Sequence, residues 1–246
     1  MKNVIGLVFF SMFLTSVIAQ VEGGINEKLA KSYQKGDYEG CMLKAVDLTY
    51  NDKYKKDPEP YLYAAFCYYQ ISLSEDPSIL EDYPNALKDA IKYLIKFKKK
   101  DKEGELAGQN DGEINTILAA YFEEAVDFFK KENYKSAAYN FKQLTDWYDE
   151  NTDLIFLQAM CDALEGKSTA SQYFDQSIPV FLEQKKSGNI KVRREVKEIF
   201  SDSFIKYADY LNTTEKADSA KATLNLGLTL LPGNINIQSK IDSLEN

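Results

Sequence analysis

The residue types able to do chemistry are few in this chain. The 246-residue sequence has no histidine, three cysteines and 38 acidic residues. Without histidine, Ser–His–Asp and Cys–His arrangements are excluded, and so are histidine ligands of a catalytic zinc. Catalysis by carboxylates alone, or by a lysine or tyrosine base, is what remains. We therefore expect a protein that is not an enzyme and that uses no cofactor or metal.

Paired carboxylates are the one constellation that still suggests hydrolysis. Adjacent acids occur at Glu81–Asp82 and at Glu123–Glu124. A glycosidic bond is hydrolysed by two carboxylates that face one pocket at roughly 5 to 10 Å from each other. Neighbouring residues of a helix point in different directions, so these acids do not face each other. We interpret them as solvated, and keep a carboxylate glycosidase or lyase as the third alternative.

The two arginines of the chain, Arg193 and Arg194, are adjacent in the segment KVRREVK. This segment begins a predicted helix, where the helix dipole disfavours cations. A guanidinium binds carboxylates and phosphates through paired N–H donors. We therefore predict that Arg193 and Arg194 contact an anion.

The charge balance limits the class of partner. The formal net charge is −8, and the sequence pI is about 4.9. A nucleic-acid partner requires a basic field, so we expect none. Hydrophobic residues make up 44% and charged residues 28% of the chain, which is typical of a folded soluble protein.

The N-terminus predicts export. In MKNVIGLVFFSMFLTSVIAQ, Lys2 precedes an apolar stretch, and Val17 and Ala19 are suited to signal peptidase. The alternative is a membrane anchor, but the stretch is short for a span of about 20 residues. We predict a signal peptide at residues 1–19 and an exported domain at residues 20–246 that does not span a membrane. The periplasm is the expected compartment.

Export bears on the three cysteines, Cys41, Cys67 and Cys161. Cys41 and Cys67 fall on neighbouring predicted helices and could form a disulfide. The alternative is that all three are small buried apolar residues, as free cysteines often are. The sequence leaves both interpretations open.

The elements that would position these residues are helices. Beyond residue 22, apolar residues recur three and four positions apart, which is the period of an α-helix. Short breaks separate about eleven predicted helices. The breaks are Lys35–Asp37, Lys56–Pro58, Ser74–Asp82, Asp101–Gly112, Glu150–Asp153, Glu165–Thr169, Lys186–Asn189, Asn212–Glu215 and Pro232–Asn234. We predict an all-α fold.

Small residues recur where the predicted helices would cross. Ala125 and Ala137 are twelve residues apart (137 minus 125), and so are Ala208 and Ala220 (220 minus 208). Two helices approach closely where side chains are small, and larger residues one turn away fill the flanking grooves. In the first of these pairs the larger residues include Tyr121, Phe128, Tyr134, Phe141 and Leu144.

These pairs resemble the tetratricopeptide repeat, a helix–turn–helix unit of about 34 residues. The resemblance covers about residues 23 to 234 in about five units, and Ser72–Asp82 is an insertion in the second. It implies a right-handed α-solenoid in which the first helix of each unit lines a concave, partner-binding face. A non-repetitive helical bundle is the alternative.

The resemblance also implies which residues contact a partner. Carried over unit by unit, they are Leu62, Phe66, Tyr69, Phe122, Val126, Phe129, Ile205, Asp209 and Asn212. For each of them the alternative is packing against the neighbouring unit.

The expected function is a non-catalytic protein–protein scaffold or adaptor in the cell envelope. Such a protein would be a periplasmic subunit of an assembly or secretion machine, held at the outer membrane through a partner. The alternative is a carbohydrate-binding or nutrient-uptake accessory protein. That alternative requires exposed, coplanar tyrosines, or the single tryptophan, Trp147, in a cleft.

Overall fold

The computed structural model describes residues 26–245, so the predicted signal peptide lies outside the described residues. All regular structure within them is helical, which confirms the predicted all-α class. The helices are α1 (Asn26–Gln34), α2 (Tyr38–Tyr50), α3 (Glu59–Ser72), α4 (Pro77–Asp82), α5 (Ala86–Lys98), α6 (Glu105–Gln109), α7 (Asp111–Lys130), α8 (Tyr134–Thr145), α9 (Thr152–Leu164), α10 (Thr169–Lys186), the 3-10 helix η1 (Arg194–Val196), α11 (Lys197–Thr213), α12 (Ala217–Leu230) and α13 (Ile235–Glu245).

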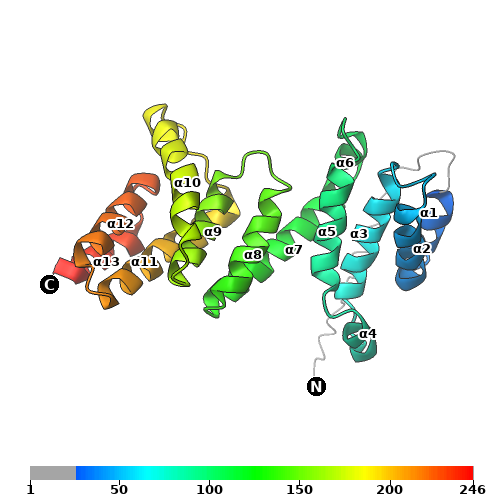
Figure 1. Cartoon of the computed structure of the whole chain (residues 1–246), viewed down its shortest axis with the longest axis horizontal. Helices are drawn as coiled ribbons and strands as arrows, with labels where there is room; N and C mark the ends of the chain where they lie inside the picture. The colour runs from blue at the N-terminus through cyan, green and yellow to red at the C-terminus, as the bar shows by residue number, and fades with distance from the viewer. Residues whose placement is uncertain (1–25, 246) are drawn as a thin grey trace, which may run out of the picture.

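The helices form an elongated row, with α1 and α13 at opposite ends (Figure 1). Most helices pack on the helices that precede and follow them in the chain: α2 lies between α1 and α3, and α8 between α7 and α9. Helices two places apart also meet, as α9 and α11 do. None of the described helices is long and apolar enough to cross a membrane.

Local sequence signals explain where several helices begin and end. Gly36 and Gly166 follow α1 and α9 with φ angles of 76° and 69°. Glycine adopts this left-handed conformation without steric cost, so the helices end at the predicted breaks. Asp37 caps α2 and Asn133 caps α8, since their side chains accept hydrogen bonds from the backbone N–H groups of Gly40 and Ser136.

Two short helices occupy segments that the sequence predicts as loops. α4 lies within the insertion Ser72–Asp82, and the Asp76 side chain accepts a hydrogen bond from the Ser78 N–H at 2.9 Å. At the start of α6, the Asp101 side chain accepts a hydrogen bond from the Ala107 N–H at 2.7 Å. With six and five residues, these helices are too short for an apolar period to predict them.

The helix crossings predicted from small residues lie deep in the core. α7 packs on α8, and α11 packs on α12. The alanines at these crossings are fully buried: Ala125, Ala137, Ala208 and Ala220. Gly227 in α12 is also buried, and a Cβ atom there would lie 2.9 Å from the Phe204 ring. A larger side chain at Gly227 would therefore push α12 away from α11.

All three cysteines are free and buried, in agreement with the interpretation that they are small apolar core residues. The Cys41 thiol lies 3.5 Å from the backbone oxygen of Leu29 and donates to it. The hydrogen bond with Cys41, together with burial, raises the pKa of Cys67.

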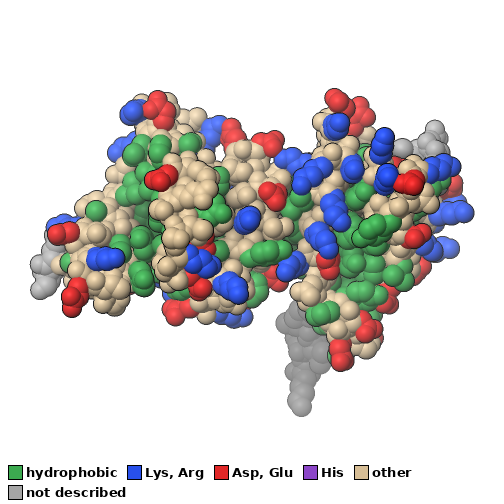
Figure 2. Space-filling view, viewed as in Figure 1, with side chains coloured by type: hydrophobic (Ala, Val, Ile, Leu, Met, Phe, Trp, Pro, Cys, Tyr) green, Lys and Arg blue, Asp and Glu red, His purple; other side chains and the backbone are tan. Residues whose placement is uncertain are grey.

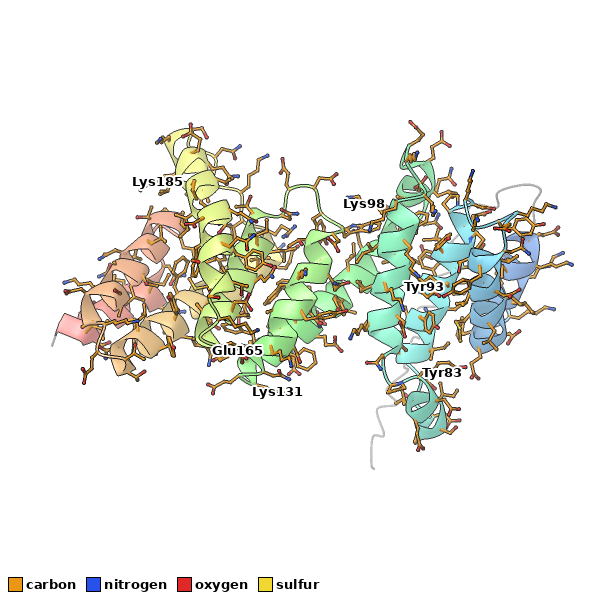
Figure 3. The ribbon with its side chains drawn as sticks, in the orientation of Figure 1. Tyr83, Tyr93, Lys98, Lys131, Glu165 and Lys185 are labelled. Carbon is orange, nitrogen blue, oxygen red and sulfur yellow. The ribbon has the colours of Figure 1, made fainter. Side chains whose placement is uncertain are left out.

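Lysines gather over α5 on the face shown in Figure 2. One of them, Lys98, reaches the segment after α8 (Figure 3). Its Nζ donates to the backbone oxygen of Trp147 at 2.5 Å and pairs with Asp149 at 2.6 Å. This contact joins two segments 51 residues apart, and it holds the loop that contributes to the site described next.

Candidate partner-binding pocket

An open pocket of about 730 Å³ lies between α7 and the start of α9, and we call it the α7 pocket. Leu118 and Leu154 lie beneath it and are each 1% exposed. Phe122 and Val126 also line it and remain partly exposed. The other lining residues are Asn115, Ala119, Glu123, Asp127, Lys130, Tyr148, Arg193 and Glu195. The pocket therefore has an apolar floor and a polar, mainly charged rim.

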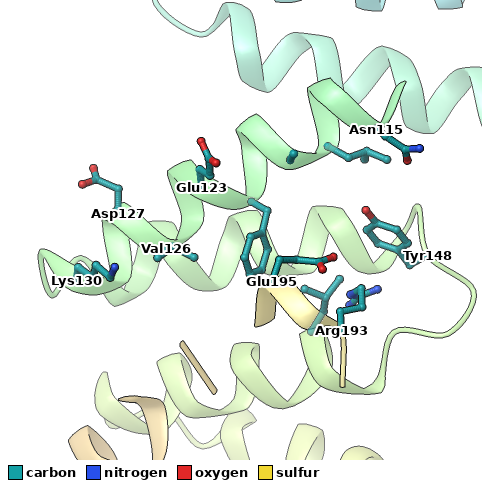
Figure 4. A pocket seen from close by; sticks show the side chains of 12 residues that line it. Asn115, Glu123, Val126, Asp127, Lys130, Tyr148, Arg193 and Glu195 are labelled. Carbon is teal, nitrogen blue, oxygen red and sulfur yellow. The ribbon is translucent and has the colours of Figure 1, made fainter. Parts of the chain in front are cut away.

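Figure 4 shows how the two sides of this pocket are built. Glu123 and Asp127 project from one side of α7, and Val126 points to the other. Tyr148 and Arg193 lie across the pocket from α7. One wall is therefore a regular helix, and the other consists of irregular segments that join helices.

The second wall depends on the linker between α10 and α11. Residues 187–193 of this linker form no helix, and they run back to the loop between α8 and α9. Lys191 pairs with Glu150 at 2.6 Å, and the Arg193 N–H donates to Asp153 Oδ2 at 3.0 Å. The Arg193 guanidinium also pairs with Asp153. These contacts fasten two segments about 40 residues apart along the chain.

Arg193 is held inside this wall and is not open to a new partner. The exposed fraction of its side chain is 20%, and that of the Asp153 side chain is 4%. The guanidinium lies 4.3 Å from the centre of the Tyr148 ring, a cation–π distance. Burial raises the pKa of Asp153, and the charge of Arg193 opposes that rise. The predicted anion of Arg193 is thus a carboxylate of the same chain.

Arg194, the second predicted anion contact, lies in η1 and is exposed. It does not line the α7 pocket. The two arginines, adjacent in sequence, therefore point into different surroundings, because η1 begins between them.

Three of the predicted contact residues are core residues. Leu62, Phe66 and Phe129 are 3%, 2% and 0% exposed. The Phe129 ring packs against Tyr134 at a centroid distance of 5.5 Å. Their burial agrees with the alternative, which is packing against the neighbouring unit, since a first helix in a packed row must bury part of its own face against its neighbours.

Two of the predicted residues come together in a smaller pocket of about 310 Å³, which we call the α3 pocket. Phe66 and Tyr69 of α3 line it, and Phe66 is 2% exposed. The remaining lining residues are Tyr33, Gln70, Gly112, Glu113, Thr116 and Ile117. The α3 pocket thus borders α7 as well.

The predicted residues of α11 belong to neither pocket. Asp209 pairs with Lys240 of α13 at 2.5 Å, so the last helix already occupies this carboxylate. Ile205 is half-buried and packs on the core, and Asn212 is exposed near the end of α11. The structure therefore brings Phe122, Val126 and Arg193 together, but not the α11 residues.

Sequence reasoning missed Tyr148, Leu154 and Glu195, which complete the α7 pocket. They come from a loop, a helix start and a linker, where no period or motif marks them. Within residues 26–245, no three Cys, Asp or Glu side chains group closely enough to hold a metal ion. The carboxylates that line the pocket, Glu123, Asp127 and Glu195, are all exposed.

No protein-family model, curated protein or solved structure matches the chain. The residues of the α7 pocket are therefore interpreted from their own chemistry and surroundings.

Proposed function

We propose that this protein is a non-catalytic scaffold that binds a segment of a partner protein in the α7 pocket. We further propose that its helices form a right-handed α-solenoid of about five tetratricopeptide-like units. The order of packing supports this, because successive helices pack on each other while α1 meets α3 and α9 meets α11. In such an array the first helices share one face.

The observation that carries the binding function is the open apolar floor between two first helices. Phe122 and Val126 remain partly exposed in a pocket of about 730 Å³, a volume that accepts several side chains. Burying apolar surface there would stabilise a complex by about 25 cal/mol per Å² before the costs of association. Because the rim is charged, the apolar floor is the surface on which an apolar side chain of the partner would bind.

Hydrolysis is less well supported by the same pocket. A general acid needs a carboxyl group kept protonated at neutral pH by an apolar environment. Glu123, Asp127 and Glu195 are instead exposed to solvent. The pocket therefore gives none of these three carboxyl groups an apolar environment.

Sugar binding is also less well supported. Tyr68 and Tyr93 stack on each other, with ring centres 5.6 Å apart and an angle of 17° between the rings. They do not form a flat platform with both faces free for a sugar ring. Trp147 is half-buried against the core, with Lys98 Nζ at 5.9 Å from its ring centre.

Location in the cell envelope rests on the N-terminal sequence. Lys2 and the following apolar stretch support export to the periplasm, and a partner in an assembly or secretion machine would hold the protein at the outer membrane. Cleavage predicts Gln20 as the first residue of the mature protein. Mass spectrometry of protein purified from its native host tests this, and retention of residues 1–19 would contradict it.

The binding function is tested by capture of a partner in the native host. The tagged protein is crosslinked and purified, and a partner should co-purify in a fixed ratio. Phe122→Asp combined with Val126→Asp should abolish capture, because charges would enter the apolar floor. Phe129 is unsuitable for substitution because it is fully buried.

Tyr139→Asp is the matched control, since Tyr139 is 42% exposed on α8 and lines neither pocket. It should leave capture unchanged, and circular dichroism should show that all variants remain folded. A protein that purifies alone, or a partner that survives the double substitution, would contradict the proposal.

A further inference from the structure

One side of α7 is exposed along almost its whole length between the two pockets. The exposed stripe consists of Gly112, Thr116, Ala119, Glu123, Asp127 and Lys130, which lie three or four residues apart and therefore share one helix face. The α3 pocket includes Gly112 and Thr116, and the α7 pocket includes Ala119 and Glu123. The exposed stripe therefore lies between the two pockets, and we call it the ridge.

The side chains of the ridge are small where it separates the two pockets. Gly112, Thr116 and Ala119 have small side chains, so a second chain can approach the helix backbone there. The stretch from Thr116 to Glu123 is about 10 Å long, given a rise of about 1.5 Å per residue. A partner segment crossing it would need about three to five residues, at about 3.3 Å per extended residue.

The charges beside the ridge are mainly negative. Glu123 lies on the ridge, Glu113 borders the α3 pocket and Glu195 borders the α7 pocket. None of these three is in an ion pair with a described lysine or arginine. Lys130 already pairs with Glu198 at 3.5 Å, and Asp127 with Lys131 at 2.8 Å. The Arg193 charge is compensated by buried Asp153.

Glu123 is close to both hollows. It lines the α7 pocket, and burial together with the nearby charge of Glu123 raises the pKa of Tyr69 in the α3 pocket. A cation bound over the ridge would therefore lie near the Glu123 carboxylate, whether it approached from the α3 pocket or from the α7 pocket.

We infer that the partner segment is cationic and bridges both pockets across α7. It places one apolar side chain in the α3 pocket, another in the α7 pocket, and a lysine or arginine against Glu123 between them. This inference rests on the proposed function, and it names the chemistry of the partner that the pocket takes.

A selection from random twelve-residue peptides on the purified protein tests the inference. Enriched peptides should contain two apolar residues about three to five positions apart with lysine or arginine between them. A chosen peptide should bind about fivefold more weakly to Glu123→Lys, measured by fluorescence anisotropy, which is the usual scale of one solvated ion pair. Higher salt should weaken its binding to the native protein.

Two further variants locate the bound peptide. Ala119→Trp raises the ridge, so it should reduce binding at least about tenfold, because the peptide could no longer reach both pockets. Asp175→Lys makes the same charge change as Glu123→Lys at an exposed position of α10, outside both pockets, and should leave affinity nearly unchanged.

The outcomes separate the inference from the proposed function. If neutral or acidic peptides are enriched and are lost on Phe122→Asp with Val126→Asp, the α7 pocket binds peptides but the cationic bridge is wrong. If cationic peptides bind Ala119→Trp as well as the native protein, the bridge is also wrong. If no peptide is enriched over the empty support, both proposals fail.

Discussion

Two neighbouring pairs of alternate helices, α9 with α11 and α7 with α9, differ in how the space between them is filled. Between α9 and α11, the Phe156 ring lies 4.7 Å from Phe200 and 5.0 Å from Phe204, measured between ring centres. Between α7 and α9, an open pocket of about 730 Å³ remains above Leu118 and Leu154. The same chain thus closes one junction with aromatic rings and leaves the adjacent one open.

The difference shows that helix order alone does not decide where a surface hollow forms. Rings large enough to span the gap close α9 against α11, with Phe181 of α10 adding a further ring at 5.6 Å from Phe200. On the open side, a linker held by Arg193 and Asp153 stands as a wall. Dispersion and apolar burial therefore stabilise one junction, and a charge pair shapes the other.

The largest expected effect comes from removing a buried aromatic ring between α9 and α11. Phe156→Ala should lower the free energy of unfolding by about 3–5 kcal/mol, because a fully buried ring leaves a cavity. Phe122→Ala on the open side should cost about 1–2 kcal/mol, since that ring already keeps solvent contact. Urea unfolding measures both. Equal losses would mean that the open side is packed as tightly as the closed one.

Breaking the wall of the open side should have the next largest effect. Asp153→Ala leaves the Arg193 guanidinium without its buried partner, at a cost of about 2–3 kcal/mol, because Arg193 retains partial solvent contact. Hydrogen exchange should also become faster at the Arg193 amide, which donates to Asp153. Asp149→Ala, an exposed acid of the adjacent loop, is the control and should cost less than about 1 kcal/mol.

A stability loss that does not reach the Arg193 amide would contradict the role of Asp153 in fastening the linker. It would place the effect in α9 itself.

Glu59 of α3 lies in neither junction, and its carboxyl group makes the stability of the folded protein depend on pH. Burial, reinforced by Asp57, raises the pKa of Glu59 from 4.5 to about 7. The folded state therefore binds this proton more tightly than the unfolded state does. The stability it contributes is fully present below about pH 4.5 and is lost as the pH rises through about 7.

Glu59→Gln should remove this pH dependence. Near pH 8 the variant should be about 1–2 kcal/mol more stable than the native protein, a value reduced from the full shift because the carboxyl group is only half-buried. Near pH 4 the two should be equally stable. Urea unfolding across this range measures the difference. A constant difference would show that Glu59 is ionised alike in both states, and Glu75→Gln, at an exposed position, should change nothing.

The smallest expected effect concerns how α7 itself is held. Tyr121 is buried on α7, and its hydroxyl has no hydrogen-bond partner among the described residues. Tyr121→Phe should raise the free energy of unfolding by about 1 kcal/mol, because an unsatisfied buried hydroxyl is removed. Tyr61→Phe is the matched control and should lower it, since that hydroxyl donates to the Lys55 carbonyl at 2.9 Å. A loss at Tyr121 would mean that an ordered water satisfies its hydroxyl.

Much of the fold could be predicted because local rules act over a few residues. Apolar spacing predicted the long helices, and glycines such as Gly36 predicted where they end. α4 was not predicted, because a helix of six residues is too short to show an apolar period. The candidate site was predicted only in part, through Phe122, Val126 and Arg193.

By itself, the sequence determined the helical class, the absence of histidine chemistry and the acidic character of the surface. Only the tertiary structure decided that Phe129 is buried in the core whereas Phe122 faces a pocket. It also decided that Arg193 meets Asp153, 40 residues earlier in the chain. The reason is that helix periodicity shows which residues share a face, whereas the neighbour that covers this face is set by packing between distant segments.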